Sequence, residues 1–271
     1  MIAMSAEASY RRVARTALRQ GALVTGERAV PEEVPVAFSY GGSTHAVMMA
    51  SPADLIDFAV GFSLTEGIIS ARAEIRAIEV VEASQGYDVQ VDLMDAEADA
   101  LRARRRHMAG PVGCGLCGIE SIEQAVRVVP NLGGVKMSIE GHEIVAAMKS
   151  LNDAQNLNRE TRAVHGAGFY NAGKGLLAAR EDVGRHNALD KLAGAVINAN
   201  ISAEAGIVVV TSRLSVEMVQ KTAILGSPLL AAISAPTALA IETAEAAGIT
   251  LVALVRGEDF EIFTRADRVI L

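Results

Sequence analysis

The chain has 271 residues, of which 51% are hydrophobic, enough to fold into one large domain or two closely packed ones. Its net charge of −7 disfavours a phosphate backbone, so no nucleic-acid partner is expected. No stretch approaches the roughly 18 uninterrupted apolar residues that a membrane span requires, and residues 1–20 lack the apolar segment of a signal peptide. We therefore expect a cytoplasmic protein that does not contact a membrane.

The N-terminal part of the chain predicts a small, β-rich region. Residues 1–30 are polar and basic, and we expect them to form a partly helical extension. Residues 31–110 form the next predicted unit, a hairpin and helix subdomain. Two short apolar runs on either side of Gly41-Gly42-Ser43 predict a β-hairpin at residues 34–39 and 46–49.

One helix and a second pair of strands are expected after this hairpin. Ser51 and Pro52 mark the start of the helix, as its N-cap and its first helical residue, and Gly67 marks its end. Apolar residues between them recur at helical spacing. Residues 75–81 and 89–93 predict the two strands.

The C-terminal part, residues 111–271, predicts an α/β cofactor-binding region that begins with a cysteine-containing loop. Two helices are expected over residues 119–150. Strands and helices then alternate, with strands at 176–179, 207–210, 229–233 and 249–255 and helices at 187–199, 215–225 and 236–247. This alternation indicates a mixed, largely parallel sheet. Polar segments that follow the strands, at 180–186, 211–213 and 234–236, should line one crevice.

The two cysteines stand in one glycine-rich loop, Gly113-Cys114-Gly115-Leu116-Cys117-Gly118. Two sulfurs three positions apart in a cytosolic chain indicate redox, sulfur or metal chemistry rather than a structural disulfide. The glycines let a partner approach closely, and a helix start after the loop favours the thiolate, the form that accepts a persulfide sulfur. Spacing alone leaves open a sulfur or redox loop, half of a zinc site, and an inert pair.

Two polar segments after predicted strands are candidate ligand sites. Residues 180–187 crowd charged and polar side chains around one glycine, which favours a site over an ordinary polar turn; the candidates are Glu181, Asp182, Arg185 and His186. The segment after the most apolar strand combines hydroxyls, an arginine and a helix start, which could seat a phosphate. Its candidates are Arg213, Ser215, Glu217, Gln220 and Lys221.

Two weaker signals lie near these segments. His165 stands among small residues that allow close ligand approach, although a lone histidine is often structural. The segment that ends the last predicted strand reaches the same edge of the sheet, and is either a plain turn or a nucleotide-recognition loop. It comprises Val255, Arg256, Gly257, Glu258, Asp259 and Phe260.

In their order along the chain, these segments resemble one family, the FdhD formate dehydrogenase accessory sulfurtransferases. The matching stretches are LTEGII (64–69), CGLCG (114–118), REDVGRHNALDKL (180–192), TSRLSVEMVQKTA (211–223) and LVRGEDFEIFT (254–264). Around His165 the chain departs from the Gly-Gly-x-His-Ala block of that family, with Arg162, Ala163 and Gly166 at the differing positions.

The resemblance implies a cytidine-deaminase-like three-layer α/β fold with a smaller N-terminal β-rich part, acting as a homodimer. It implies that a cysteine desulfurase passes persulfide sulfur to Cys114, with Cys117 assisting. The sulfur then goes to the molybdenum cofactor of formate dehydrogenase, bis-molybdopterin guanine dinucleotide, which binds as a substrate. The resemblance places the guanine nucleotide at residues 255–260 and implies no permanent metal.

Other functions remain open at this point. A chaperone that escorts the molybdenum cofactor without touching its sulfur would use the same phosphate-seating residues. A zinc deaminase needs a His-x-Glu motif before Pro-Cys-x-x-Cys, whereas here Gly113 precedes Cys114 and no His-x-Glu precedes the loop. A plain dithiol oxidoreductase is the third alternative.

Overall fold

The structure is a computed structural model that describes residues 9–98 and 129–271. Its N-terminal part begins with a hairpin of two strands, β1 (Tyr10–Arg19) and β2 (Ala22–Pro31). A four-stranded sheet follows in the order β4-β3-β6-β5, made of β3 (Val34–Tyr40), β4 (Ser43–Ala50), β5 (Ile75–Ala83) and β6 (Gly86–Leu93). One helix, α1 (Leu55–Thr65), packs on this sheet through an apolar cluster that includes Phe38, Phe58 and Phe62.

The C-terminal part contains a six-stranded sheet in the order β13-β12-β11-β10-β8-β9. Its strands are β8 (His165–Asn171), β9 (Gly175–Asp182), β10 (Ile207–Val210), β11 (Leu229–Ala232), β12 (Thr250–Arg256) and β13 (Asp259–Ile262). The helices beside it are α4 (Gly141–Ala154), α5 (Asn156–Thr161), α6 (Arg185–Asn198), α7 (Val216–Leu225) and α8 (Ala238–Ala247). Short elements complete this part: β7 (Ile139–Glu140), β14 (Val269–Ile270) and the 3-10 turns Ala203–Ala205 and Ala266–Arg268, while a further 3-10 turn, Arg72–Glu74, precedes β5 in the N-terminal part.

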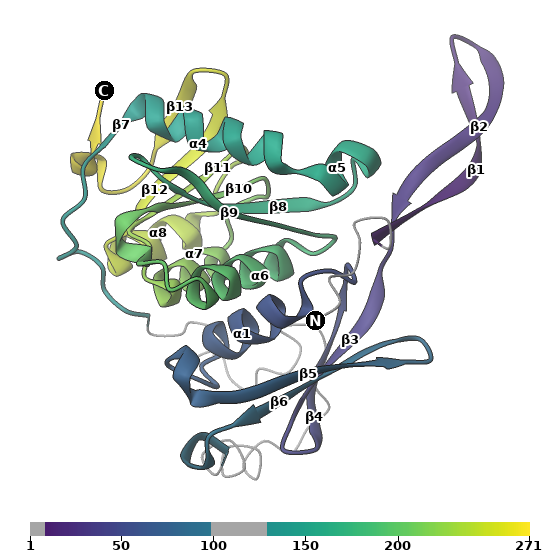
Figure 1. Ribbon diagram of the computed structural model, residues 1–271. Helices are drawn as coiled ribbons and strands as arrows, with labels where there is room; N and C mark the ends of the chain where they lie inside the picture. The colour runs from purple at the N-terminus through teal and green to yellow at the C-terminus, as the bar shows by residue number, and fades with distance from the viewer. Residues whose placement is uncertain (1–8, 99–128) are drawn as a thin grey trace.

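Helices cover both faces of the six-stranded sheet, so this part has the expected three layers (Figure 1). Successive side chains of β10 point to opposite faces of the sheet, and both faces are covered. Ile207 and Val209 belong to the apolar cluster with α4, whereas Val208 and Val210 belong to the cluster with α6, α7 and α8. A strand whose residues are all buried reads in the sequence as a continuous apolar run. The cytidine-deaminase-like classification stays a prediction, as does the domain boundary near residue 110, which lies outside the described residues.

The sheet is mixed, but the expectation of a largely parallel one is wrong. The only parallel pairings in this sheet are β10 with β11 and β11 with β12, whereas β8, β9 and β13 join by antiparallel pairing. Tight turns explain the difference, because parallel neighbours need a long crossover and a short turn produces a hairpin. Gly257 turns the chain from β12 into β13 with a φ of 61°.

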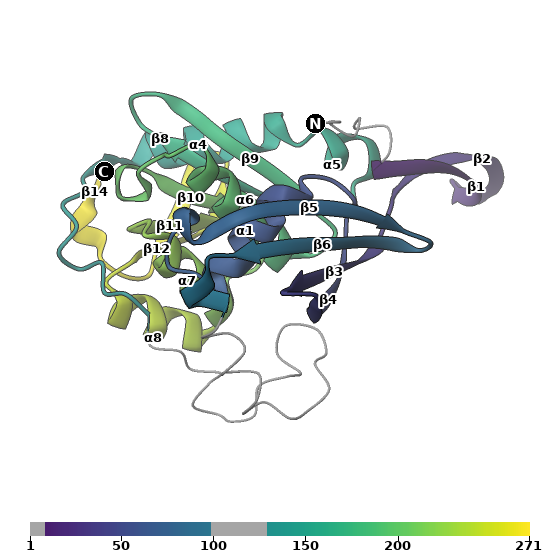
Figure 2. The ribbon, with the colours of Figure 1, turned by 60° about the horizontal axis from the view of Figure 1, so that its bottom comes forward.

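Residues 10–31 form a hairpin and not the partly helical extension that the sequence predicted. The strands pair antiparallel from Tyr10 opposite Pro31 to Arg19 opposite Ala22. Gln20 and Gly21, with φ values of 49° and 83°, form the two-residue turn between them. The hairpin projects away from the rest of the molecule in both views (Figures 1 and 2).

The start of α1 also differs from the prediction. The helix begins at Leu55, and its N-cap is Asp54 in the left-handed conformation, not Ser51. Ser51 is fully buried and precedes the helix. Within residues 129–150, the described part of the segment expected to hold two helices, the chain reaches Gly141 before a helix begins.

Helices α1 and α6 join the two parts of the molecule by close backbone contact. A β-carbon placed on Gly61 of α1 would overlap the carbonyl group of Asp190, and one placed on Gly194 of α6 would overlap the carbonyl group of Asp57. Glycine is required at both positions because no side chain fits between the helices. This contact fixes the position of α6, whose first residues belong to the candidate site.

Candidate functional site

The carboxyl ends of β9, β10, β11 and β12 meet at one edge of the six-stranded sheet, together with the start of β8. His165 on β8 pairs with Asp182 on β9. Thr211 follows β10, and its amide donates to the Gly166 carbonyl at 3.0 Å, while its hydroxyl accepts from the Gly166 amide at 2.9 Å. The predicted crevice segments therefore do lie together, as the sheet rule requires.

The loops after β10 and β11 are also joined at this edge. The Leu214 amide donates to the Ala235 carbonyl at 3.2 Å, and the Thr237 amide donates to the Leu214 carbonyl at 2.9 Å. Three helices begin beside these loops: α6 after Gly184, α7 after Ser215 and α8 after Thr237. Only Thr237 caps its helix with its side chain, so the amino ends of α6 and α7 carry no side-chain cap.

Four predicted residues come together where α6 and α7 begin, and we call them the edge cluster: His165, Arg185, His186 and Glu217. The His186 Nε2 atom lies 4.0 Å from a carboxylate oxygen of Glu217, which is too far for a hydrogen bond. Within the described residues, Arg185 Nε and His186 Nε2 are buried atoms without a hydrogen-bond partner. Such groups are costly in a folded protein unless a ligand or water completes them.

Both histidines of the edge cluster are neutral at pH 7. Burial, followed by the charges of Arg185 and Lys221, lowers the pKa of His186 to about 4, against the opposing effect of Glu217 and Glu66. Burial and Arg185 likewise lower the pKa of His165, while Asp182 opposes them. The positive charge of the edge cluster therefore comes from Arg185.

Glu217 remains ionised beside these histidines. Burial acts to raise the pKa of its carboxyl group. The Ser215 hydroxyl, the backbone amide and the charge of Arg185 outweigh burial and hold that pKa below its ordinary value. Arg213, in the loop between β10 and α7, is exposed.

The predicted segment from Val255 to Phe260 ends β12 and turns into β13 at the same edge of the sheet. Arg256, Gly257, Glu258 and Asp259 are exposed. Val255 and Phe260 belong instead to the apolar cluster under α4, where the Phe260 ring lies against Gly141. The exposed part of this turn is thus four residues long, and the two apolar residues position it.

Asp182 belongs to a fully buried polar network behind the edge cluster. Its carboxylate lies 2.7 Å from Lys191 Nζ and accepts hydrogen bonds from the Ser51 and Gly184 amides and from Asn187 Nδ2, at 2.9, 2.7 and 2.9 Å. Lys191 Nζ also donates to the Ser51 carbonyl at 2.9 Å. Every group is satisfied, so Asp182 holds the β9–α6 turn in place.

Lys221 belongs to a second buried network, between α1, α6 and α7. Its ammonium group lies 2.8 Å from Asp190 Oδ1 and 3.3 Å from Glu66 Oε1, and donates to Thr65 Oγ1 at 2.9 Å. Burial lowers the pKa of Lys221, but these carboxylates outweigh it and raise the pKa above its ordinary value. The charge of Lys221 is therefore compensated inside the protein, and Gln220 beside it is also buried.

Glu181 caps a helix. Its two carboxylate oxygens accept hydrogen bonds from the Leu157 and Asn158 amides at the start of α5, each at 2.8 Å. Burial raises the pKa of its carboxyl group, and these two amides oppose that effect. The segment 180–187 thus divides into positioning residues and the pair Arg185 and His186, which face the edge.

Cys114 and Cys117, the predicted sulfur-carrying residues, lie outside the described residues. In the described part of the chain, no group of three or more histidine, cysteine or carboxylate side chains is arranged to hold a metal ion. The helices described in the structure include none with the length and hydropathy of a membrane span.

Residues that the sequence analysis missed complete the buried networks. The sequence predicts Ser51 as a helix cap, but Ser51 binds Asp182 through its amide and the Val183 amide through its hydroxyl, the latter at 3.2 Å. Lys191 and Asp190 are charged residues between Leu189 and Leu192 on a buried helix. That placement, a charge pair inside an apolar stretch, was the available signal.

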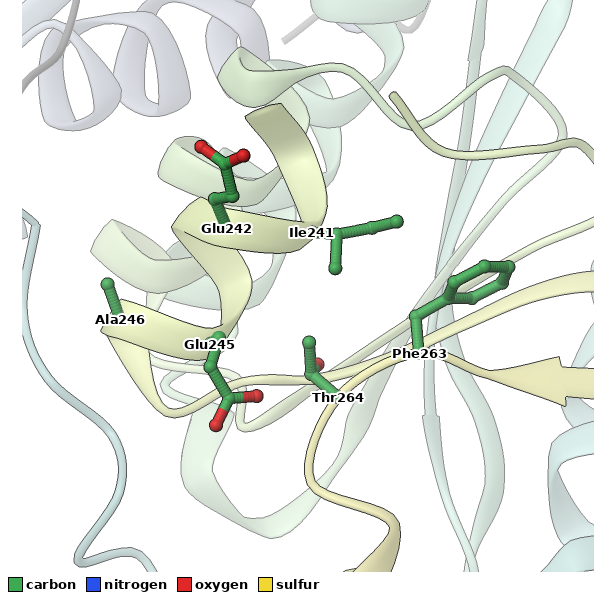
Figure 3. Close-up of a pocket in the computed structure, with 6 residues that line it drawn as sticks. All are labelled: Ile241, Glu242, Glu245, Ala246, Phe263 and Thr264. Carbon is green, nitrogen blue, oxygen red and sulfur yellow. The ribbon is translucent and has the colours of Figure 1, made fainter. Parts of the chain in front are cut away.

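A hollow of about 510 Å³ lies between α8 and the segment after β13 (Figure 3). It is lined by Ile241, Glu242, Glu245 and Ala246 of α8 and by Phe263 and Thr264. The Thr264 hydroxyl accepts from the Leu251 amide near the start of β12, so this hollow lies toward the other end of the strands. Its two exposed glutamates disfavour an anionic ligand, in contrast to the edge cluster.

Comparison with known proteins identifies the family. The sequence profile of the FdhD/NarQ family matches residues 31–270. The chain is 86% identical over 271 residues to the sulfur carrier protein FdhD of Agrobacterium fabrum, with 100% of each chain covered. It is 56% identical over 260 residues to the protein of the same name from Brucella abortus, covering 96% of this chain and 97% of that one.

A solved structure agrees with this result. The fold is similar, with a TM-score of 0.77 and 27% identity, to a crystal structure from Desulfotalea psychrophila assigned as a formate dehydrogenase accessory protein. The similarity covers 96% of this chain and 99% of that one. The chain belongs to the FdhD/NarQ family.

Proposed function

We propose that this protein is a sulfurtransferase that carries persulfide sulfur on Cys114 and delivers it to a bis-molybdopterin guanine dinucleotide cofactor destined for formate dehydrogenase. The observation that carries this proposal is the 86% identity, over the full length, to a protein named a sulfur carrier. The sulfur donor is a cysteine desulfurase, and the protein acts in the cytoplasm as a homodimer. The only two cysteines of the chain stand in one Cys-Gly-Leu-Cys sequence.

Loading of the carrier is a thiol exchange. The Cys114 thiolate attacks the outer sulfur of the persulfide on the desulfurase, and a new S–S bond forms as the old one breaks. The desulfurase cysteine leaves as a thiolate, and Cys114 becomes the persulfide. No external oxidant or reductant is needed in this step.

Release assigns a role to Cys117. Its thiolate attacks the inner sulfur of the Cys114 persulfide, which forms a Cys114–Cys117 disulfide and expels the outer sulfur as hydrosulfide with the electron pair of the broken bond. Hydrosulfide is the form delivered to the cofactor. A cellular dithiol then reduces the disulfide, a pairing that the Cys-x-x-Cys spacing allows.

The edge of the six-stranded sheet is the proposed seat of the guanine dinucleotide. The amino end of α6 lacks a side-chain cap and has no acidic residue in its first turn, and such a helix end attracts phosphate. Arg185 and Arg213 add positive charge, and Nε of Arg185 and Nε2 of His186 lack a hydrogen-bond partner among the described residues. The exposed turn at residues 256–259 meets the guanine base.

Formate dehydrogenase activity in bacteria that lack their own carrier tests the proposal. The wild-type chain should restore the activity and the Cys114→Ala variant should not, although the purified variant should bind guanosine diphosphate as tightly as the wild type. Restored activity with Cys114→Ala would instead identify a chaperone that escorts the cofactor without handling sulfur, and would overturn the proposal.

A further inference from the structure

The β1–β2 hairpin is a separate feature of this chain. It precedes residues 31–270, the part matched by the family profile, and it projects from the body of the protein (Figure 2). Except for Ala29, which is buried, its residues are exposed or half-buried. An isolated two-stranded hairpin is marginally stable in water, so an exposed one calls for a reason to persist.

The base of the hairpin is anchored beside the candidate site. Arg28 Nη2 donates to the carbonyl of Thr161 at 3.1 Å, and an Arg12 nitrogen lies 3.9 Å from the Glu160 carboxylate. Both contacts are with the end of α5, a few residues before His165 of the edge cluster. A partner held by the hairpin would therefore stand next to the edge of the sheet.

Arginines lie along the hairpin, from its anchored base to Arg19 beside the turn. A hollow of about 400 Å³ between the hairpin and the end of α5 is lined by Arg12, Arg15, Arg19, Arg28 and Arg162. The register places Arg28 opposite Val13, and Val13 lies two residues before Arg15 on the same strand. The side chains of Arg28 and Arg15 therefore lie on the same face of the hairpin. Within the described residues no carboxylate pairs with Arg15, Arg19 or Arg162, so the charges of these three side chains are available to a partner.

Arg162 ends α5 and adds its charge to this hollow. Its backbone, with a φ of 56°, is the left-handed C-cap of the helix, a conformation common at helix ends. Its side chain is exposed beside four other arginines.

The rest of the hairpin is suited to a protein partner. Leu18 and Leu23 are paired across the strands next to the turn, and 71% and 76% of their surfaces are exposed. In the described part of the chain neither outer edge of this two-stranded sheet is paired. A free strand edge can take up the backbone of an extended peptide, which a nucleic acid does not offer, and this favours a protein partner over a nucleic acid.

We propose that the β1–β2 hairpin and the end of α5 form a docking surface for an acidic, extended segment of a partner protein. The arginines pair with the carboxylates of the segment, and a free strand edge accepts its backbone by strand addition. Arginine and apolar residues together are typical of protein interfaces.

Fluorescence anisotropy with a labelled peptide of alternating glutamate and valine tests this proposal on the full-length protein. We expect binding that weakens with added salt, and an affinity about tenfold lower for the double variant Arg15→Gln/Arg19→Gln. The matched control Lys136→Gln/Lys174→Gln makes the same change in net charge on exposed lysines away from the hairpin, and should bind like the wild type.

An equal loss in both double variants would overturn the proposal, because net charge alone would then explain the binding. Tighter binding of a single-stranded oligonucleotide than of the peptide of equal charge would overturn the proposal in favour of a nucleic acid. Pelleting with anionic lipid vesicles that the Arg15→Gln/Arg19→Gln variant loses, without binding of the peptide, would overturn it in favour of a membrane surface. Circular dichroism of each variant establishes that the fold is intact. Persulfide loading of Cys114 should not change in either variant.

Discussion

Lys191 and Asp182 form an ion pair that has no contact with solvent: Nζ lies 2.7 Å from Oδ2, and both side chains are 0% exposed. The ammonium group also lies 5.4 Å from the centre of the Phe58 ring. Because Asp182 ends β9 and Lys191 lies within α6, the pair fixes the turn that presents Arg185 and His186. A site that must hold a ligand in one orientation benefits from such rigid support.

Replacing Asp182 should therefore be strongly destabilising. In Asp182→Ala the ammonium group of Lys191 stays buried without its counter-charge, which costs about 3–5 kcal/mol of unfolding free energy. Urea unfolding of the variant measures this loss. The double variant Asp182→Ala/Lys191→Met buries no charge and should recover more than half of it. A single variant as stable as the wild type would show that the pair does not support the turn.

Close packing of α1 on α6 predicts a second stability effect. Gly61→Ala and Gly194→Ala should each lower the free energy of unfolding by at least about 2 kcal/mol, because the added methyl group meets a backbone carbonyl that cannot move alone. Gly134→Ala is the matched control, since open space surrounds that glycine. Thermal unfolding compares the three variants, and an equal shift in all three would contradict the packing argument.

The lowered pKa of His186 predicts a dependence of stability on pH. The unfolded histidine, with a pKa near 6.5, binds a proton that the folded one, with a pKa of about 4, does not bind between these values. Above pH 6.5 the titration of His186 does not reduce the free energy of unfolding. As the pH falls from 6.5 toward 4, this titration lowers the free energy of unfolding by at most about 3 kcal/mol.

His186→Asn lacks this titration and serves as the comparison. Urea unfolding at pH 7 and near pH 4 should show a larger loss for the wild type than for the variant, because the carboxylates that also titrate are common to both. Parallel losses in the two proteins would show that His186 is not held neutral by its surroundings.

Charge at the sheet edge should govern nucleotide affinity. Arg213→Gln should weaken binding of guanosine diphosphate by about tenfold, since a charge-assisted contact to phosphate is lost. Lys174→Gln removes the same charge from the turn between β8 and β9, at the opposite edge of the sheet, and should have no effect. Calorimetric titration measures both affinities. Equal weakening by the two variants would place the nucleotide elsewhere.

Local patterns in the sequence are sufficient to predict a strand that is completely buried. The run Ile207–Val210 predicted β10 with its bounds, because four β-branched apolar residues between polar ones fit a strand buried on both faces. The crevice was also predicted, since the carboxyl ends of parallel strands converge whatever their order in the sheet.

Sequence patterns do not predict the structure where a residue's role depends on a contact distant in the sequence, or where an element has no buried face. Ser51 looked like a helix cap, but its amide is bound by Asp182, 131 residues further along the chain. The sequence predicts Lys221 as a phosphate ligand, but its charge is compensated by Glu66, which follows α1, and by Asp190 of α6. The β1–β2 hairpin shows no apolar alternation because both of its faces are largely open, and only its Gln20-Gly21 turn could have revealed it.

Intact mass spectrometry after incubation with a cysteine desulfurase and cysteine tests the sulfur chemistry directly. The wild-type chain should gain the mass of one sulfur atom, a reducing agent should remove it, and Cys114→Ala should gain none. Cys117→Ala should still gain the sulfur but release hydrosulfide more slowly. A Cys114→Ala protein that takes up sulfur as the wild type does would contradict the claim that Cys114 is the carrier.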